Sequence, residues 1–176
     1  MESNKKIKSK KNIMHTAKCL FEEKGIENVT FSDVARSADV CRTTVFNHFA
    51  NTNELMIALC EQEILDIEEY CKSTGLSGTP VIVALFDKLI EDTAYYPVLM
   101  TKLTNNTIIG KETVKSITII EDLIKNNLQV ENSQQMTILI MGAYYGLVNH
   151  YHLNNKKFDA EKMKTEFHQL VENILG

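Results

Sequence analysis

The chain has 176 residues, of which 44% are hydrophobic, and its formal net charge at pH 7 is −4. This length allows one domain or two small ones with a sizeable core. Prolines occur only at Pro80 and Pro97, and alternating runs of Val, Ile and Thr are few, which favours an all-helical protein. There is no apolar run of about 18 residues, and the apolar stretch at 13–21 is interrupted by polar side chains, unlike a signal peptide. We therefore expect a cytoplasmic protein with no membrane span.

Charge is distributed unevenly along the chain. Residues 1–50 contain nine Lys or Arg and six Asp or Glu, whereas residues 51–176 contain ten and seventeen. Five positive charges lie close together near the amino terminus, at Lys5, Lys6, Lys8, Lys10 and Lys11. A basic end on an acidic body is typical of a protein that binds nucleic acid with one part only, although a solvated tail has the same composition.

Residues typical of catalysis or metal binding do not form a recognisable pattern. The four cysteines are Cys19, Cys41, Cys60 and Cys71. They have neither C-x-x-C nor zinc-ligand spacing, so we expect free thiols. His150 and His152 would point to different faces of a helix, which argues against a metal site. No nucleophile–base pair or phosphate-binding glycine loop occurs, so we expect no enzymatic activity, no metal and no cofactor.

The first third of the chain predicts three helices. An apolar stripe defines the first of them: Ile13, Ala17, Leu20 and Phe21. Gly25 is expected to end that helix. Thr30 and Asp33 have the spacing of a capping box and predict the start of a short second helix. The segment 39–41 interrupts it, and a third helix is expected to begin near Arg42.

The rest of the chain predicts about six further helices. Asn51, followed three residues later by Glu54, predicts the cap of a long fourth helix that runs to about Cys71. Five more amphipathic or apolar segments follow, at 80–95, 98–109, 111–127, 133–153 and 159–175. The expected fold is all-α, with about nine helices. Its expected parts are an amino-terminal domain at 1–50, a connecting helix at 51–73 and a helical domain at 74–176.

A short helix, a tight turn and a second short helix can form a helix-turn-helix, which directs the second helix into the DNA major groove. The residues at this point resemble the DNA-binding domain of the tetracycline-repressor (TetR) family. The resemblance covers roughly residues 7–60 and includes the L-F-x-x-x-G ending at Gly25, the capped helix from Thr30, the turn, and the sequence Phe46-Asn-His-Phe49. Beyond residue 72 only the number and order of the helices are similar.

The resemblance implies a set of DNA-contacting residues: Thr30, Ser32, Arg42, Thr43, Thr44, Asn47, His48 and Thr52. Among these, Arg42 and Asn47 have the side chains best suited to the edges of guanine and adenine. Thr43, Thr44 and His48 are better suited to holding phosphates. His48 could equally pack at the helix end, and Phe49 is interpreted as packing.

Four residues depart from the family pattern. Asp39 replaces the usual turn glycine and tolerates a left-handed conformation better than most residues do. Cys41 replaces the usual capping serine and is a poorer acceptor, which should weaken the cap by about 0.5–1 kcal/mol. Phe46 replaces tyrosine and Thr52 replaces lysine, so two groups that would bind phosphate are missing, which the amino-terminal lysines would compensate. A redox role for Cys41 is the less favoured alternative to a simple capping role.

The carboxy-terminal helices are expected to form a dimer and to enclose a ligand. The helix at 133–153 is apolar around its circumference, so with 159–175 it is expected to pack against a second copy, as the resemblance also implies; a buried core helix is the alternative. The helices between 80 and 127 would enclose an apolar cavity for a hydrophobic or aromatic effector. Its candidate lining residues, which could also be plain core, are Phe86, Leu89, Ile90, Tyr95, Tyr96, Met100, Leu103, Ile120 and Tyr144.

The function expected from the residues and the resemblance is a sequence-specific DNA-binding regulator. Its most favoured form is a homodimeric repressor that a small-molecule effector releases from a palindromic operator. An activator or a regulator without a ligand is the nearest alternative. A helical protein-interaction module that uses the apolar segment 133–153 is an alternative from another class.

Overall fold

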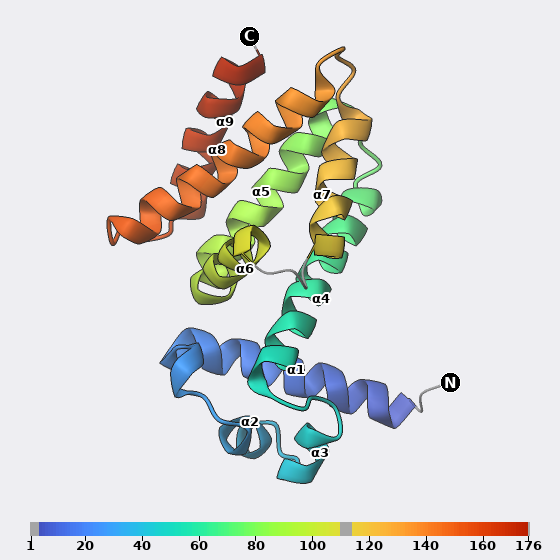
Figure 1. Cartoon of the computed structure of the whole chain (residues 1–176), viewed down its shortest axis with the longest axis vertical. Helices are drawn as coiled ribbons and strands as arrows, with labels where there is room; N and C mark the ends of the chain where they lie inside the picture. The colour runs from blue at the N-terminus through green and yellow to red at the C-terminus, as the bar shows by residue number, and fades with distance from the viewer. Residues whose placement is uncertain (1–3, 110–113, 176) are drawn as a thin grey trace. The chain divides into compact units, whose positions relative to one another are not determined.

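The computed structural model describes residues 4–109 and 114–175, with the side chains of 105–109, 114–117 and 175 left out of the description. The described residues form nine α-helices and one short 3-10 helix, which confirms the predicted all-α fold (Figure 1). The chain divides into two compact units, Met1–Gln62 and Glu63–Gly176. The division falls inside α4, the helix predicted to connect the two parts of the chain.

The first unit contains three α-helices, one short 3-10 helix and the start of a fourth α-helix. These are α1 (Asn4–Lys24), η1 (Ile26–Asn28), α2 (Phe31–Ser37), α3 (Arg42–Phe46) and the first half of α4 (Thr52–Ser73). The apolar stripe of α1 is buried as predicted, and it shares the core with Val34, Val45, Phe49 and Leu55. Gly25 follows α1 at φ 78°, and its amide donates a 2.9 Å hydrogen bond to the carbonyl oxygen of Phe21. The helix therefore ends where the sequence predicts.

The first helix begins earlier than its apolar stripe indicates. It starts at Asn4, so the five amino-terminal lysines lie within α1 rather than in an arm before it, and all five are exposed. Lysine is a good helix former, and its side chain needs no partner on the solvent side. The stripe reports only the part of a helix that is buried, which in α1 begins at Ile13.

The second unit is a bundle of helices around α5. Beyond the end of α4 it contains α5 (Thr79–Tyr95), α6 (Pro97–Ile109), α7 (Val114–Asn127), α8 (Ser133–Leu153) and α9 (Ala160–Leu175). Most predicted bounds agree within two residues, and the predicted start of α7 at 111 lies outside the described residues. Helix α5 packs against α6, α7 and α9 (Figure 1). Helix α8 packs against α6, α7 and α9.

The core of the second unit contains an aromatic cluster and a buried polar pair. The ring of Phe86 lies 4.6 Å from that of Phe167 and 5.7 Å from that of Tyr144, measured between centroids. The hydroxyls of Tyr144 and Thr93 are hydrogen bonded at 2.9 Å, and burial raises the pKa of Tyr144 well above its usual range. Tyr144 is therefore neutral and satisfied inside the bundle. Among the described residues, no helix combines the length and the apolar character that a membrane span requires.

Candidate functional site

The start of α2 is held by the predicted capping box. The amide of Asp33 donates to Oγ1 of Thr30 at 3.2 Å, and the amide of Thr30 donates to Oδ2 of Asp33 at 3.0 Å. The Thr30 hydroxyl, the Thr30 amide and the Arg36 guanidinium all lower the pKa of Asp33, so this carboxylate stays ionised. Thr30 and Ser32 are exposed beside the cap, where the resemblance places DNA contacts.

The turn between α2 and α3 has the left-handed residue that the sequence predicts. Asp39 has φ 52°, and the amide of Val40 donates to the carbonyl oxygen of Ala35 at 3.0 Å. Nδ2 of Asn12 on α1 donates to the carbonyl oxygen of Ala38 at 2.8 Å. This hydrogen bond from α1 fixes the end of α2 and was not foreseen, because no sequence pattern pairs residues 26 positions apart.

Cys41 occupies the cap position of α3 but makes no side-chain hydrogen bond to the free amides of the helix. Its Sγ lies 2.9 Å from Oγ1 of Thr44, and the side chain is exposed. The hydrogen bond with the Thr44 hydroxyl lowers the pKa of the Cys41 thiol. The side-chain capping hydrogen bond is therefore absent, whereas the sequence predicts only a weaker one.

Helix α3 presents its first residues to solvent. Arg42, Thr43 and Asn47 are exposed, whereas Thr44 and His48 are half-buried, with Asn47 and His48 directly after the last helical residue. The resemblance implies contacts with bases or phosphates at all five positions. Short helices of this kind read DNA with exposed side chains at their amino-terminal end.

Phe46 touches a side chain that the sequence did not lead us to expect. The Arg42 guanidinium carbon lies 5.3 Å from the centroid of the Phe46 ring, which is a cation–π geometry. The ring is 45% exposed and meets Phe31 edge-on, with centroids 5.1 Å apart. The Phe46 ring therefore packs against the Arg42 guanidinium, and Phe31 on α2 packs against the Phe46 ring.

Two hydrogen bonds cap the start of α4, and the sequence predicts a cap there. The amide of Glu54 donates to Oδ1 of Asn51 at 2.9 Å, and Oε2 of Glu54 accepts from the amide of Ala50 at 2.6 Å. Thr52 is the first helical residue and is half-buried. These two hydrogen bonds define the start of α4 directly after the α3 region.

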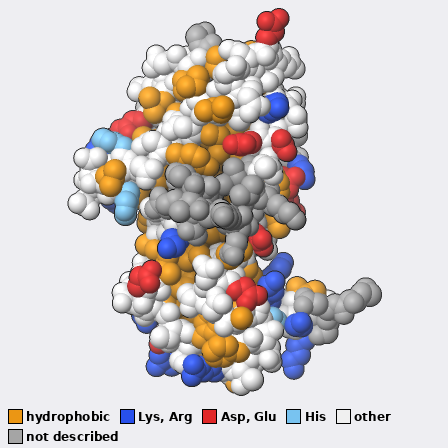
Figure 2. Space-filling model, in the orientation of Figure 1, with side chains coloured by type: hydrophobic (Ala, Val, Ile, Leu, Met, Phe, Trp, Pro, Cys, Tyr) orange, Lys and Arg blue, Asp and Glu red, His pale blue; other side chains and the backbone are white. Residues whose placement is uncertain are grey.

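Positive side chains gather on the first unit. The exposed lysines of α1 are joined there by Arg36 on α2 and Arg42 on α3. Figure 2 shows several Lys and Arg side chains over this unit on the visible face. Nζ of Lys10 lies 5.8 Å from the ring centroid of Phe49, next to the end of α3. This charge favours a polyanion as the partner.

The residues predicted to line an effector cavity lie mostly in the core of the second unit. Seven are buried: Phe86, Leu89, Ile90, Met100, Leu103, Ile120 and Tyr144. Tyr96 is half-buried, and Tyr95 is 79% exposed. These positions are consistent with core packing as well as with a cavity wall, so their role as a ligand site stays a prediction.

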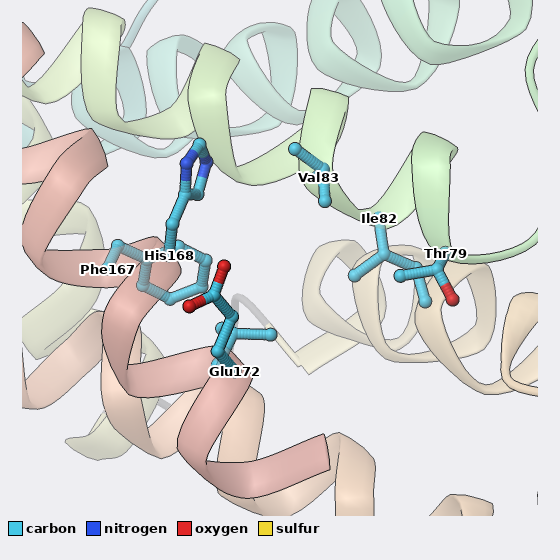
Figure 3. Close-up of a pocket in the computed structure, with 7 residues that line it drawn as sticks. Thr79, Ile82, Val83, Phe167, His168 and Glu172 are labelled. Carbon is cyan, nitrogen blue, oxygen red and sulfur yellow. The ribbon is translucent and has the colours of Figure 1, made fainter. Parts of the chain in front are cut away.

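Two cavities of the second unit are lined by other residues. One, of about 400 Å³, lies between α5 and α9 (Figure 3). Its lining consists of Thr79, Ile82, Val83, Phe167, His168, Val171 and Glu172. The other, of about 410 Å³, lies between α4, α5 and α7, where its lining includes Cys71, Val81 and Leu123. Neither was foreseen, because their linings combine residues far apart in the chain.

Helix α8 has one apolar face without a covering element among the described residues. Its exposed apolar residues are Ile138, Leu139 and Leu153, with exposed fractions of 60%, 50% and 76%. Gly142 and Gly146 lie on the same face, and a Cβ atom built on either would have no neighbour within 4 Å among the described residues. The opposite face of α8 is buried, so the predicted excess of apolar surface is present.

These features define a class of protein. A capped helix, a left-handed turn and a short exposed helix on a three-helix unit form a helix-turn-helix, an arrangement that many DNA-binding domains use, and a helical unit follows it in the chain. Residues 13–59 match the family model described as "Bacterial regulatory proteins, tetR family". This match covers 47 of the 176 residues, so the amino-terminal unit is similar to the TetR family of bacterial regulatory proteins.

Two curated proteins are similar to the chain over different shares of its length. The chain is 25% identical over 195 aligned positions to the "Probable acrEF/envCD operon repressor" of Escherichia coli K12, covering 96% of this chain and 86% of that protein. It is 24% identical over 82 residues to the "Transposon Tn10 TetC protein" of Escherichia coli, covering 46% of this chain but only 42% of that protein.

The fold is shared with solved structures. The transcriptional regulator FadR from Bacillus subtilis, solved in complex with stearoyl-CoA, superimposes with a TM-score of 0.75 at 13% sequence identity. The match covers 94% of this chain and 97% of that chain. The similarity therefore extends through both units of the chain.

Proposed function

We propose that the protein is a homodimeric repressor that binds a palindromic operator and is released from it by a small apolar effector. The observation that carries the DNA-binding part is the exposed amino-terminal end of α3, with Arg42 held above Phe46 and Asn47 exposed beyond the helix. Arg42 would read a guanine and Asn47 an adenine through the major groove. Thr30, Ser32, Thr43, Thr44, His48 and Thr52 would position the domain on phosphates.

A dimer is supported by the exposed apolar face of α8, continued by Leu170 on α9, which is 41% exposed. Four exposed aliphatic side chains on two adjacent helices form an apolar surface of a kind that monomeric proteins rarely leave exposed to water. A second copy would cover this face by two-fold symmetry. The two amino-terminal units of the dimer would then bind two operator half-sites about 34–36 Å apart.

An apolar effector is supported by the composition of the bundle core and by one structural relative. The predicted lining residues are aliphatic or aromatic, apart from the Tyr hydroxyls. FadR from Bacillus subtilis, which shares the fold, was solved with stearoyl-CoA. An effector would act by binding one of two conformations of the dimer more tightly than the other.

The test is binding of the purified protein to DNA that flanks its own gene, measured by gel shift and by fluorescence anisotropy against unrelated DNA. Arg42→Ala should weaken specific binding about 30-fold or more, because each of the two subunits loses one bidentate base pairing of about 1–3 kcal/mol. Lys125→Ala removes an exposed charge from α7 and serves as the matched control, with unchanged affinity. Equal affinity of the Arg42→Ala variant and the natural protein would contradict the proposed base contact of Arg42.

A further inference from the structure

Helices α5 and α9 are joined by polar pairs at successive turns. Nζ of Lys164 lies 2.6 Å from Oε1 of Glu91, and Nε2 of His168 donates to Oδ1 of Asp87 at 2.8 Å. Each step of four residues forward on α9 is matched by four residues backward on α5, so the two helices run antiparallel. In each of these pairs, α9 supplies the basic side chain and α5 supplies the acid.

The next turn breaks this pattern. Four residues beyond His168 lies Glu172, and four residues before Asp87 lies Val83. An acid on α9 is thus opposed by an aliphatic side chain on α5, and among the described residues no Lys or Arg lines the cavity that opens here. The carboxylate of Glu172 is the group in this cavity that a ligand of opposite charge could pair with.

The cavity at this turn has the size and the walls of a small-molecule site. Its volume of about 400 Å³ is within the usual range of roughly 300–1,000 Å³ for ligand pockets. Ile82 and Val83 come from α5 and Phe167 from α9 (Figure 3), and Val171 on α9 also lines the cavity. Apolar walls with a few polar groups suit a ligand that is mostly apolar and has one charged end.

We propose that this cavity binds a small organic cation, an ammonium group on an aliphatic or aromatic body. The body would lie among Ile82, Val83 and Val171, and the ammonium would pair with the carboxylate of Glu172. This site is separate from the residues proposed for the effector and lies on the flank of α9 that faces α5. Leu170, the α9 member of the proposed dimer surface, projects about 200° around the helix from His168.

The helix ends at the cavity and Glu172 together determine which charge on a ligand is favoured. Thr79 is the first residue of α5, where the free amides carry about half a positive charge. Glu172 carries a full negative charge and lies in the last turn of α9, where the free carbonyls add about half a negative charge. The negative contribution is larger, so a cation is favoured over an anion of the same shape.

The experiment is a titration of the full chain with three probes of equal length, hexylammonium, hexanol and hexanoate. Binding is followed by the methyl resonances of Ile, Leu and Val, with Ile82, Val83 and Val171 reporting on the cavity. Hexylammonium should shift these methyls and bind about three- to fivefold more tightly than hexanol, the effect expected of one partly exposed ion pair. Hexanoate should bind more weakly than hexanol.

Glu172→Gln should abolish the preference for hexylammonium over hexanol while both probes still bind. Glu121→Gln, which removes an exposed acid from α7, is the matched control and should keep the preference. Val83→Trp, which fills the cavity, should abolish binding of all three probes. Shifts at other methyls only, equal affinity for the three probes, or a preference that persists in Glu172→Gln would each overturn the proposal. None of these readouts requires DNA, so a failed operator assay leaves them interpretable.

Discussion

At the scale of single residues, Phe46 on α3 does more than remove one phosphate ligand. From the sequence, its missing hydroxyl counts only as one phosphate ligand fewer. In the structure, the ring supports the Arg42 guanidinium at 5.3 Å and is itself supported by Phe31. An arginine that is already oriented loses less conformational entropy when it binds a guanine edge.

Replacement of Phe46 by leucine should therefore weaken operator binding even though Phe46 is proposed to touch no base. An exposed cation–π contact contributes about 0.5–1 kcal/mol, and the dimer would lose two of them, so we expect an affinity loss of about five- to thirtyfold by anisotropy. Phe46→Tyr keeps the ring and should bind at least as well as the natural protein. A Phe46→Leu loss that persists undiminished in the Arg42→Ala background would show that the ring does not act through Arg42.

Cys41 offers a second prediction at this scale. Because its thiol makes no capping hydrogen bond, the first amides of α3 lack a side-chain acceptor. Cys41→Ser should raise the free energy of unfolding by about 0.5–1 kcal/mol in urea denaturation. Cys41→Ala should change it little, since no such hydrogen bond is removed. Serine and alanine variants of equal stability would contradict the proposed weakness of this cap.

At the scale of helices, α1 carries both the core stripe and the exposed lysines. Replacement of Lys5, Lys6, Lys8 and Lys11 by glutamine keeps helix propensity and removes four charges. If these lysines meet phosphates, the plot of log affinity against log salt concentration becomes shallower by up to about 0.9 for each phosphate that is no longer neutralised. A matched control replaces four exposed lysines of the second unit, Lys72, Lys125, Lys157 and Lys162. An unchanged slope in the α1 variant would exclude α1 from the interface.

The helices themselves were largely predictable, because caps and apolar periodicity are local signals. Thr30 with Asp33 and Asn51 with Glu54 mark helix starts in the sequence and form those caps in the structure. The start of α1 at Asn4 was not predictable from its stripe, because exposed lysines leave no periodic trace.

Parts of the candidate sites could not be predicted, because they depend on pairing between distant segments. The hydrogen bond from Asn12 to Ala38, and the shared cavity of Val83 and Glu172, arise from the packing of one helix on another. The contact between Arg42 and Phe46 is local, at the i, i+4 spacing of a helix, and could have been found from that spacing.

At the scale of the whole molecule, the apolar face of α8 makes a prediction about assembly. Ile138→Asp places a charge on this face and should convert a dimer into monomers in sedimentation velocity, with loss of operator affinity. Leu65→Asp is the matched control, since Leu65 on α4 is 50% exposed and lies outside the α8–α9 face. A dimer that survives Ile138→Asp would exclude this face as the interface.

Gly142 and Gly146 give that face a further consequence. Each glycine destabilises a helix interior by about 1 kcal/mol relative to alanine, and no described neighbour in the chain requires the missing side chains. The glycines would allow the backbone of a second subunit to approach closely. The isolated subunit would then be less stable to unfolding, and packing in the dimer would compensate for this loss. The melting temperature should then rise with protein concentration, and Gly142→Ala should make the subunit more robust while making the pair weaker.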